Sequence, residues 1–344
     1  MDPQLARYSR QMLFEPIGPE GQRRLRHASV ALIGCGALGS ALADMLVRAG
    51  VGQTRLIDRD FVEISNLQRQ TLFDEHDVAA NLPKAVAAAR KLKRINSAVE
   101  VEPVVADVNC GNAVALCESA DLILDGTDNF ETRYLINDVA VKLGLPWIYG
   151  ACTAAEGLMM VVIPGRTPCL RCLWADAPSP GSTPTCETAG VLAPAVQIVA
   201  GFQVIEALKL LSGREGDLLG RLLTIEAWIG RVRTFSVEPE PRSDDCPCCR
   251  QRRFEYLSGE KVASSATLCG RNAVQLLPPA GIRVEFKQVA AGLPGAARAV
   301  SNEFLLRFQA DGCGVTLFSD GRAIITGTAD PTVARGIYAR YIGS

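Results

Sequence analysis

The sequence contains only two histidines, His27 and His76, and neither stands in a metal-ligand or catalytic-triad context. Acid–base catalysis centred on histidine therefore has almost no material in this chain. An excess of charge of one sign is also missing, because 36 Lys and Arg residues oppose 37 Asp and Glu residues. A net charge of -1 leaves no electrostatic footprint for nucleic acid or for an anionic membrane. Carboxylates, cations and thiols must carry any chemistry.

Long apolar runs are absent too. The first ten residues carry charges and lack the apolar segment of a signal peptide, and later apolar stretches are interrupted by charged or amide side chains. The chain shows no repeat and no low-complexity tract. These features indicate a soluble cytoplasmic protein, in which twelve cysteines would seldom form disulfides. Metal binding and thiol chemistry are therefore the uses to test for so many thiols.

The first 145 residues alternate between short apolar runs and helical periodicity. Residues 29–34 form an apolar run that ends in glycine, residues 37–48 are amphipathic, and residues 54–57 form a second apolar run that ends at Asp58. This order predicts a βαβ unit with parallel strands. Further strands are predicted at 99–105 and 121–125, and helices at 83–95 and 131–143. The alternation favours an α/β fold with a Rossmann-like doubly wound sheet.

After Pro146 the pattern changes. Strands are predicted at 147–152, 157–163, 221–226 and 231–237, as an antiparallel continuation of the sheet. A helix over 191–211 would end at Gly213. Residues 175–185 are rich in Pro, Ser and Gly and are predicted to be a loop. A polar, proline-rich run at 238–245 leads us to end the main domain at residue 252.

Residues 253–344 are predicted to form a small C-terminal α+β domain of unknown role. Strand-like runs occupy 304–308, 315–318 and 323–326, and Asp320-Gly321 is a hairpin-turn signal. A final helix is predicted over 331–342, with Asp330 as its cap and Pro331 at its first position. Two domains, 1–252 and 253–344, are therefore expected.

A glycine-rich turn follows the first predicted strand. The segment Gly34-Cys35-Gly36-Ala37-Leu38-Gly39 is typical of turns whose backbone N–H groups approach nucleotide phosphates at the start of a helix. Asp58 stands about 20 residues beyond, where a carboxylate can accept hydrogen bonds from a ribose hydroxyl. Nucleotide binding is favoured over the alternative that the glycines only permit close helix packing. An NAD-dependent oxidoreductase is the first alternative function.

The next motifs favour a triphosphate. Ser65-Asn66-Leu67-Gln68-Arg69-Gln70 and then Pro83-Lys84 add an amide and two cations, which suit a triphosphate better than a nicotinamide. Asp125-Gly126-Thr127-Asp128-Asn129 follows an apolar run, so its carboxylates should lie at the carboxyl end of a strand. A carboxylate there can hold Mg²⁺. The alternative is that Asp128 and Asn129 only cap the helix that starts near Phe130.

Two cysteine pairs have the spacing of metal ligands. Cys169-x-x-Cys172 and Cys246-x-x-Cys249 suit a tetrahedral Zn²⁺ held by four thiolates. Such a zinc would be structural and would tie two distant segments together. The alternative is that these cysteines pack as small hydrophobic residues. Cys248 is an alternative ligand, although its adjacency to Cys249 makes it the poorer geometric choice.

Seven motifs in order along residues 4–250 resemble the ThiF/MoeB/HesA family of ubiquitin-activating-type adenylyltransferases. They are Arg7–Gln11, Gly34–Gly39, Asp58–Asp60, Ser65–Gln70, Asp125–Asn129, Cys169–Trp174 and Cys186–Val191. Three features depart from the family pattern. Ala37 stands where the family often has glycine, Asn81-Leu82 replaces the usual glycine before Pro83-Lys84, and the C-terminal domain lacks the cysteine-containing loop of a rhodanese.

The resemblance implies a set of roles for these residues. Asp58 would bind the ATP ribose, with Asp60 and Ser65 in the same nucleotide site. Phosphates would be contacted by Asn66, Arg69 and Lys84, and magnesium would be held by Asp128 beside Asn129. In a homodimer, Arg10 would reach the triphosphate bound by the partner subunit. Cys186 would be able to bond to the activated carrier or to its sulfur.

The resemblance also implies the reaction. An ATP-dependent adenylyltransferase would convert the C-terminal glycine of a ubiquitin-like sulfur carrier of the ThiS or MoaD type, ending in Gly-Gly, into an acyl-adenylate. The attacking carboxylate is already ionised at neutral pH, so no general base is required. Cations and a metal must offset the charge on the phosphates. A cysteine desulfurase or a rhodanese would supply sulfur.

Two questions stay open at this point. Thiamine, molybdopterin and thiolated-nucleoside pathways fit the motifs about equally. A nucleotide-binding scaffold of the same fold, without catalysis, is the alternative from a different functional class.

Overall fold

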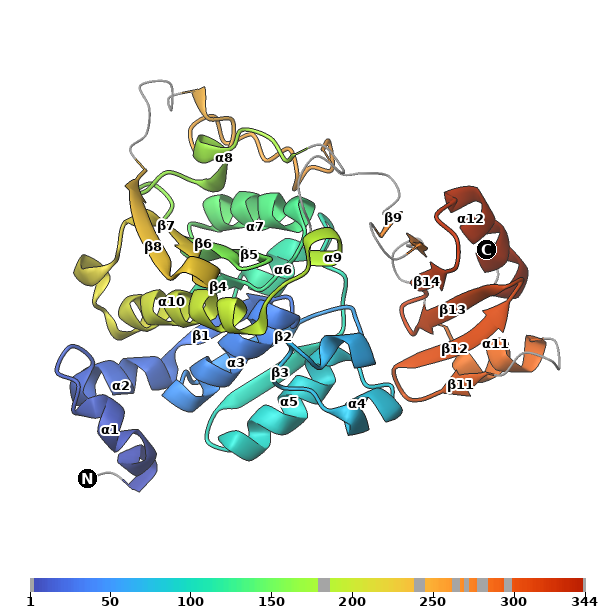
Figure 1. Ribbon diagram of the computed structural model, residues 1–344, viewed down its shortest axis with the longest axis horizontal. Coiled ribbons are helices and arrows are strands. Elements are labelled where there is room, and N and C mark those ends of the chain that lie inside the picture. Colours follow the sequence, from blue (N-terminus) through green and yellow to red (C-terminus); the bar gives the residue numbers. More distant parts are fainter. Residues whose placement is uncertain are drawn as a thin grey trace. The chain divides into compact units, whose positions relative to one another are not determined.

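The computed structural model describes residues 3–178, 186–237, 245–261, 267–268, 272–276, 284–293 and 299–342. The chain divides into two compact units, Met1–Lys261 and Val262–Ser344 (Figure 1). The division follows Lys261, whereas the sequence placed it at residue 252. The segment between these positions packs on the first unit, since the buried ring of Tyr256 lies 4.9 Å from that of Tyr134.

The first unit is built on one eight-stranded mixed sheet. Its strands in spatial order are β3 (Glu100–Val104), β2 (Gln53–Ile57), β1 (Ser29–Ile33), β4 (Leu122–Asp125), β5 (Trp147–Thr153), β6 (Glu156–Val162), β7 (Arg221–Glu226) and β8 (Arg231–Ser236). Neighbouring strands from β3 to β5 are parallel, and those from β5 to β8 are antiparallel. The predicted doubly wound sheet with an antiparallel continuation is confirmed.

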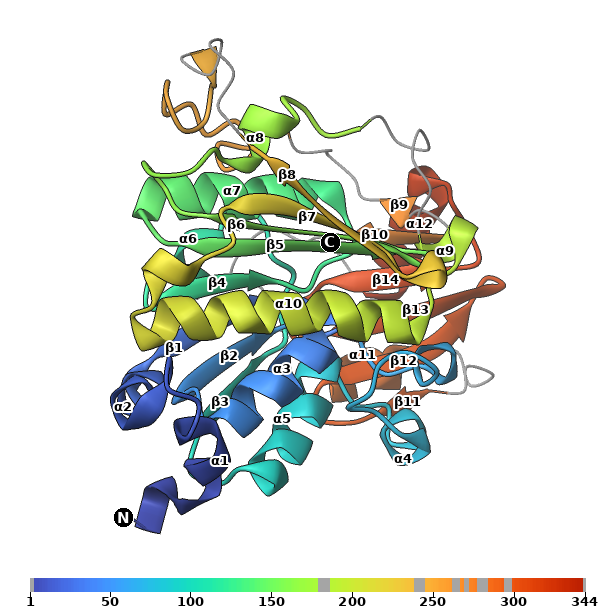
Figure 2. The same cartoon turned by 60° about the vertical axis from the view of Figure 1, so that its left-hand side comes forward.

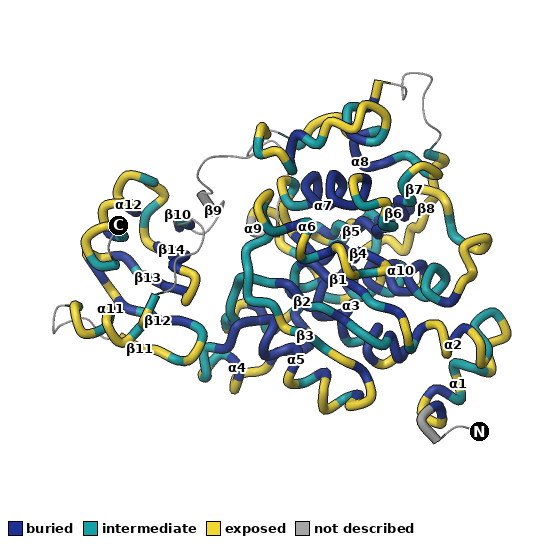
Figure 3. The backbone as a smooth tube through the Cα atoms, turned by 180° about the vertical axis from the view of Figure 1, so that it is seen from behind, coloured by how far each residue is buried: buried dark blue, intermediate teal, exposed yellow. Residues whose placement is uncertain are grey.

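Helices cover both faces of this sheet. On one face α3 (Ala37–Ala49), α5 (Lys84–Ile95) and α10 (Ala193–Ser212) pack, and on the other lie α6 (Ala113–Cys117) and α7 (Phe130–Leu143) (Figure 2). All of β4, and all but the first residue of β1, are buried between them (Figure 3). Continuous apolar runs therefore suit these central strands, because neither face meets water.

Shorter helices complete the unit. They are η1 (Pro3–Tyr8), α1 (Ser9–Met12), α2 (Gly18–His27), η2 (Ile64–Asn66), α4 (Glu75–Ala79), α8 (Leu170–Leu173), α9 (Cys186–Ala189), η3 (Glu215–Asp217) and η4 (Ala227–Ile229). The helix α10 is long and apolar enough to cross a membrane by length and composition alone, but it packs on β5, β6 and α3. It ends at Gly213, whose φ of 83° is the left-handed cap that the sequence predicted.

The second unit is an antiparallel sheet with two helices. Its strands in spatial order are β11 (Val300–Ser301), β12 (Leu305–Ala310), β13 (Cys313–Phe318), β14 (Ala323–Thr326), β10 (Ala273–Leu276) and β9 (Thr267–Leu268). The helices are α11 (Phe286–Gly292) and α12 (Pro331–Tyr341), and α12 adds Ala334 and Ile337 to the core. Asp330 caps α12 by accepting a hydrogen bond from the Thr332 N–H at 2.7 Å. The predicted α+β character and final helix are confirmed.

Candidate active site

The strand order reverses between β1 and β4, and this switch point places three loops together. Ile33, the last residue of β1, is in register with Ile57 of β2 and with Asp125 of β4. The residues that follow them therefore leave the sheet side by side at its carboxyl edge. In open α/β sheets, this crevice is where ligands bind.

The glycine-rich turn opens this edge. Gly34 has a φ of 89°, and a Cβ on Gly39 would lie 1.9 Å from the Gly34 carbonyl oxygen. The two glycines thus permit the close approach of the turn to the start of α3. The first N–H groups of α3 have no partner within the helix and remain available to an anion. Ala37 occupies the first helical position, where its side chain removes no donor.

Asp58 braces the turn from β2. Its Oδ2 accepts a hydrogen bond from the Cys35 N–H at 2.6 Å, and its Oδ1 accepts one from the Asp60 N–H at 2.6 Å. Burial raises the pKa of the Asp58 carboxyl, while the nearby charge of Lys84 opposes that rise. A carboxylate has about four acceptor positions, so two backbone bonds leave capacity for hydroxyl groups of a ligand.

Lys84 lies beside this carboxylate pair. The residue is 4% exposed, and its Nζ lies 3.2 Å from Oδ2 of Asp60. Its backbone N–H also donates to the Asp60 carbonyl at 2.8 Å. Asn81, which replaces the usual glycine of the family, has a φ of 49°. Asparagine tolerates this left-handed conformation better than most residues, so the substitution preserves the turn into α5.

The segment 65–70 lines the same edge. Asn66 is buried, and its Oδ1 accepts a hydrogen bond from the Glu63 N–H at 3.1 Å. Arg69 is partly exposed and donates from Nη1 to the Ser65 carbonyl at 2.7 Å. Gln70 is buried, with its Nε2 3.9 Å from the Cβ position of Gly36, and its Oε1 accepts no hydrogen bond from any described residue. The sequence analysis placed Gln70 in the motif but assigned it no role.

The two carboxylates after β4 have different surroundings. Asp125 is fully buried, and its Oδ1 accepts hydrogen bonds from the N–H and Oγ1 of Thr127 at 2.9 and 2.7 Å. Asp128 is exposed and forms no ion pair or hydrogen bond with the part of the chain that the structure describes. Asn129 caps α7, since its Oδ1 accepts the Thr132 N–H at 2.8 Å. The capping alternative therefore describes Asn129, whereas Asp128 is an exposed carboxylate in the loop that follows β4.

Arg10 lies far from the edge of its own subunit. Gln11, next to it in α1, donates to the carbonyl of Ala49 at 3.0 Å, and the Tyr8 hydroxyl accepts from Asn96 at 2.8 Å. Ala49 is the last residue of α3, whose first turn begins the candidate site. Thirteen helical residues separate the two ends by about 20 Å. The structure does not bring exposed Arg10 together with the other predicted site residues.

The four predicted metal ligands form one cluster. Sγ of Cys169 lies 3.8 Å from that of Cys172 and 3.7 Å from that of Cys246, while Cys172 and Cys249 are 3.4 Å apart. All four ligand atoms lie within 4.8 Å of one another. Hydrogen bonds from the other thiols lower the pKa of Cys169, which favours a thiolate there. Cys248 is buried, accepts a hydrogen bond from Asn137 Nδ2 at 3.2 Å and is not one of the four clustered thiols.

Comparison with known proteins decides the family. The ThiF family model matches residues 8–248. The chain belongs to the ThiF family. This confirms the family predicted from the motifs.

Two curated relatives of this ThiF-family chain carry related names. It is 47% identical over 341 residues, 98% of this chain and 99% of the relative, to the sulfur carrier protein ThiS adenylyltransferase of Bacillus subtilis strain 168. It is 41% identical over 251 residues, 72% and 91%, to a sulfur carrier protein adenylyltransferase of Thermus thermophilus. Among solved structures, E. coli MccB with ATP has a TM-score of 0.61 at 24% identity, covering 71% of this chain and 74% of that one, and shows the fold alone.

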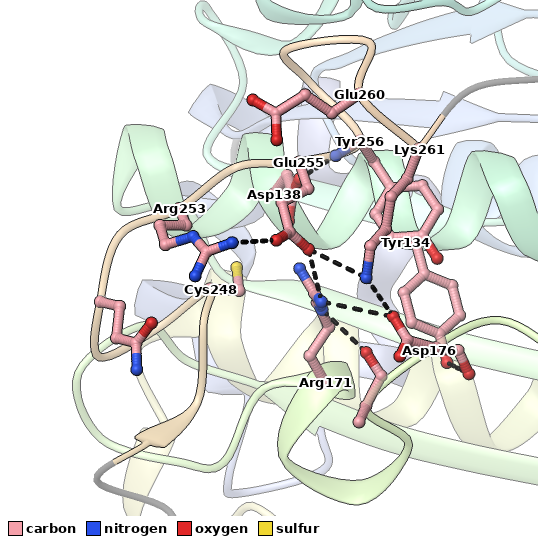
Figure 4. Close-up of polar contacts among 12 residues, drawn as sticks. Tyr134, Asp138, Arg171, Asp176, Cys248, Arg253, Glu255, Tyr256, Glu260 and Lys261 are labelled. Carbon is pink, nitrogen blue, oxygen red and sulfur yellow. Dashed lines mark hydrogen bonds and ion pairs between the residues drawn. The ribbon is translucent and has the colours of Figure 1, made fainter.

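In this ThiF-family chain an ion-pair network joins the segment of the first cysteine pair to the segment that follows the second pair (Figure 4). Arg171, between the first two cysteines, donates from Nη2 to Oε2 of Glu255 at 2.8 Å. Lys261 lies 3.0 Å from the same carboxylate and also pairs with Asp176. The Tyr134 hydroxyl of α7 donates to the carbonyls of Trp174 and Asp176 at 3.0 and 2.8 Å. The network therefore holds residues 171–176 against the segment that follows the second cysteine pair.

Cys186 begins α9, and the structure describes its backbone but not its side chain. Most of the predicted loop before it, residues 179–185, lies outside the described residues. After α9 the chain returns to the β5–β6 hairpin, where the Ala154 N–H donates to the Gly190 carbonyl at 2.8 Å. Because β5 is parallel to β4, this hairpin lies at the carboxyl edge, as the candidate site does.

Two side chains of the site were missed by sequence reasoning. Arg133 of α7 donates from Nε to Oδ2 of Asp125 at 3.1 Å, and Gln203 of α10 donates from Nε2 to the Asp125 carbonyl at 3.0 Å. The sequence contained a sign that Gln203 has a specific role, since it is an amide within an apolar helix. For Arg133 there was no such sign, because nothing in its spacing separates a buried arginine from a surface one.

Proposed function

We propose that this chain is an ATP-dependent adenylyltransferase that activates the C-terminal glycine carboxylate of a ubiquitin-like sulfur carrier protein. The observation that carries the proposal is the 47% identity to the ThiS adenylyltransferase of Bacillus subtilis over 98% of this chain and 99% of that protein. A ThiS-type carrier with a Gly-Gly end is the substrate we infer from that name. The cytoplasm stays the expected compartment.

The geometry of the edge supports this chemistry. A carboxylate oxygen of the carrier attacks the α-phosphorus of ATP, the bond to the bridging oxygen breaks, and pyrophosphate leaves. Every reactant is anionic, so cationic side chains and helix N–H groups must offset the repulsion. The start of α3, Lys84 and Arg69 supply these groups around one crevice. Asp58 keeps acceptor capacity for the ribose hydroxyls.

Magnesium fits one of the two carboxylates. Both carboxylate oxygens of Asp125 already accept hydrogen bonds, from Thr127, Arg133 and the Gly150 N–H. Asp128 is exposed beside it and has no hydrogen bond or ion pair with the described residues, so it is the residue that would hold Mg²⁺. Magnesium bound through one carboxylate and substrate phosphates is a common arrangement. The ion would neutralise charge on the departing pyrophosphate.

The cysteine cluster fits a structural zinc. Zn–S bonds of about 2.3 Å in a tetrahedron place the sulfurs roughly 3.8 Å apart. The sulfur–sulfur separations of 3.4, 3.7 and 3.8 Å agree with that geometry. Cys169 is the N-cap of α8 and Cys172 lies within that helix, while Cys246 and Cys249 lie in the segment before Lys261, so one ion would join both segments.

A homodimer would complete the site. The position of Arg10, about 20 Å along α3 from the turn of its own subunit, supports action in the site of a second copy. Exposed apolar side chains near α1 and on α10 offer a surface for that copy, and they include Leu13, Phe14, Ile198 and Ile205. Such side chains favour burial in an interface.

Cys186 would act after adenylation. Its backbone lies in the segment that returns to the carboxyl edge. A thiolate there could displace AMP from the acyl-adenylate and form a thioester. Alternatively, once a cysteine desulfurase has transferred a sulfane sulfur to Cys186, the resulting persulfide could displace AMP and form an acyl disulfide with the carrier. A cysteine desulfurase or a rhodanese would supply that sulfur.

Carrier-dependent ATP–pyrophosphate exchange tests the proposal. The protein is mixed with a ThiS-type carrier, ATP, Mg²⁺ and labelled pyrophosphate, and a carrier shortened by its last glycine is the control. Exchange with the intact carrier alone is expected. Asp128→Ala should reduce that exchange at least 100-fold, because one charge-stabilising group contributes about 3 kcal/mol. If the protein binds ATP but catalyses pyrophosphate exchange with no carrier tested, the alternative of a non-catalytic nucleotide-binding scaffold is favoured. If it binds NAD in preference to ATP, an NAD-dependent oxidoreductase is favoured.

A further inference from the structure

A buried arginine lies behind the turn that carries Asp128. Arg133, in the first turns of α7, is 6% exposed although it bears a full charge. Burying a charged arginine in the core destabilises the fold unless its charge is paired and its N–H groups are hydrogen-bonded. Its contacts therefore show what the fold uses it for.

The guanidinium of Arg133 holds both ends of the turn. Nε donates to Oδ2 of Asp125 at 3.1 Å, and Nη2 donates to the carbonyl of Thr127 at 2.8 Å. Nη2 also donates to the carbonyl of Gly150 in β5 at 3.2 Å. A planar, rigid set of donors suits three acceptors in fixed directions, which a lysine ammonium would not reproduce. The backbone from Asp125 to Thr127 is thus tied to β5.

The other face of the sheet supplies a second support. Gln203 of α10 donates from Nε2 to the carbonyl of Asp125 at 3.0 Å. Gly150 makes room for it, since a Cβ there would lie 2.4 Å from the amide of Gln203. The helices α7 and α10 cover opposite faces of the sheet (Figure 2). The turn is therefore held from both sides before it reaches Asp128.

The supported turn also contacts the glycine-rich turn. A Cβ on Gly34 would lie 2.6 Å from the carbonyl oxygen of Gly126, so the two loops pack backbone to backbone. Displacement of one loop would disturb the other. The ion pair with Arg133 also offsets the charge of Asp125, whereas Asp128, three residues further on, is exposed.

We propose that Arg133, through its ion pair with Asp125, is a positioning residue that fixes Asp128 for the magnesium–ATP complex. This inference rests on the proposed function. Because Arg133 is buried, we expect it to act on the nucleotide indirectly. Its effect is to fix the direction in which the chain leaves Thr127, and thereby the place of the carboxylate that would hold the metal.

Calorimetric binding of a non-hydrolysable ATP analogue, with Mg²⁺ and with EDTA, tests the proposal. The quantity compared is the ratio of the two dissociation constants. In Arg133→Lys the charge remains but the fork of donors is lost, so the benefit of Mg²⁺ should fall by about 10-fold to 100-fold. Affinity in EDTA should change by less than about 2-fold, because metal-free binding does not use Asp128.

Two further variants separate positioning from stability. Thr127→Val removes only the hydroxyl donor to Asp125 and should lower the benefit of Mg²⁺ in the same direction but more weakly. It provides the test if Arg133→Lys fails to fold. Arg55→Met removes an ion pair of 2.8 Å with Glu102 at the remote β2–β3 edge of the same sheet and serves as the control. It should lower the melting temperature and leave the magnesium ratio unchanged.

The outcomes are distinguishable. The inference would be overturned if folded Arg133→Lys protein had the wild-type ratio of dissociation constants with Mg²⁺ and with EDTA. It would also be overturned if the nucleotide affinity of the wild type did not depend on Mg²⁺. Absence of carrier-dependent exchange in the wild type would instead refute the proposed function, and the binding ratio would still be measured independently of it.

Discussion

The network around Glu255 predicts unequal effects for two substitutions in one ion pair. Arg171 and Glu255 are 2% and 10% exposed at their side chains, and their atoms Nη2 and Oε2 lie 2.8 Å apart. If Glu255 becomes methionine, buried Arg171 keeps, among the described residues, the Ala175 carbonyl at 3.0 Å and the exposed Asp176 at 3.5 Å as polar partners, with the Tyr256 ring centroid 5.7 Å away. Leaving a buried charge uncompensated costs about 3–5 kcal/mol.

The reciprocal substitution is milder. If Arg171 becomes methionine, Glu255 retains Lys261 at 3.0 Å and Arg253 at 2.6 Å. Both remaining cations reach solvent, so the lost contact is one charged hydrogen bond of about 1.5–3 kcal/mol. The two variants should therefore differ by about 2 kcal/mol, or roughly 4–8 °C in melting temperature for a unit of this size. Arg253→Met is the control, and it should cost about 1 kcal/mol or less because its side chain is 62% exposed.

Differential scanning calorimetry at equal protein and zinc concentrations measures the melting temperatures of the wild type and the three variants, which gives the order of their stabilities. The pKa of Glu255 is lowered by a hydrogen bond from Lys261, with Arg171 adding to it. A depressed carboxylate pKa contributes stability above its unfolded value of about 4.3 and loses it as the pH falls through the folded value. The gap between wild type and Glu255→Met should therefore narrow below about pH 4. Equal losses for the two methionine variants at pH 7, or a larger loss for Arg171→Met, would refute the reasoning.

Three further predictions concern the metal, the dimer and the thiol. Metal analysis should find one zinc per chain, lost with a lowered melting temperature in Cys172→Ser and retained in Cys248→Ser, since four-thiolate sites contribute to folding; a stable zinc-free wild type would contradict this. Mixed dimers of Arg10→Ala and Asp128→Ala chains, each inactive alone, should regain some exchange, because one site then has both residues; no recovery in confirmed mixed dimers would exclude action across the interface. Cys186→Ala should keep pyrophosphate exchange but lose any thiol-reducible adduct with the carrier, and sulfur transfer at the wild-type rate would show that the thiol is dispensable.

Much of the fold follows from local pattern. Apolar runs ending in glycine or aspartate predicted β1, β2 and β4, because buried parallel strands need no alternation. Asp330 and Gly213 predicted helix ends, since a cap depends on one residue and its neighbouring backbone. The strands β9, β10 and β11 were not predicted. They are short and gain stability only from partners elsewhere in the chain.

The site divides in the same way. The sequence by itself determined the glycine turn, the acid at position 58 and the two cysteine pairs, because each is a short motif whose spacing carries its geometry. Only the tertiary structure showed that the Asp125 carboxylate is buried and hydrogen-bonded within the protein while Asp128 is exposed. It also showed that Cys248 accepts a hydrogen bond from Asn137. The same holds for Arg133, whose partners lie on β4 and β5. Burial and hydrogen-bond partners come from residues distant in sequence, so no local pattern can encode them.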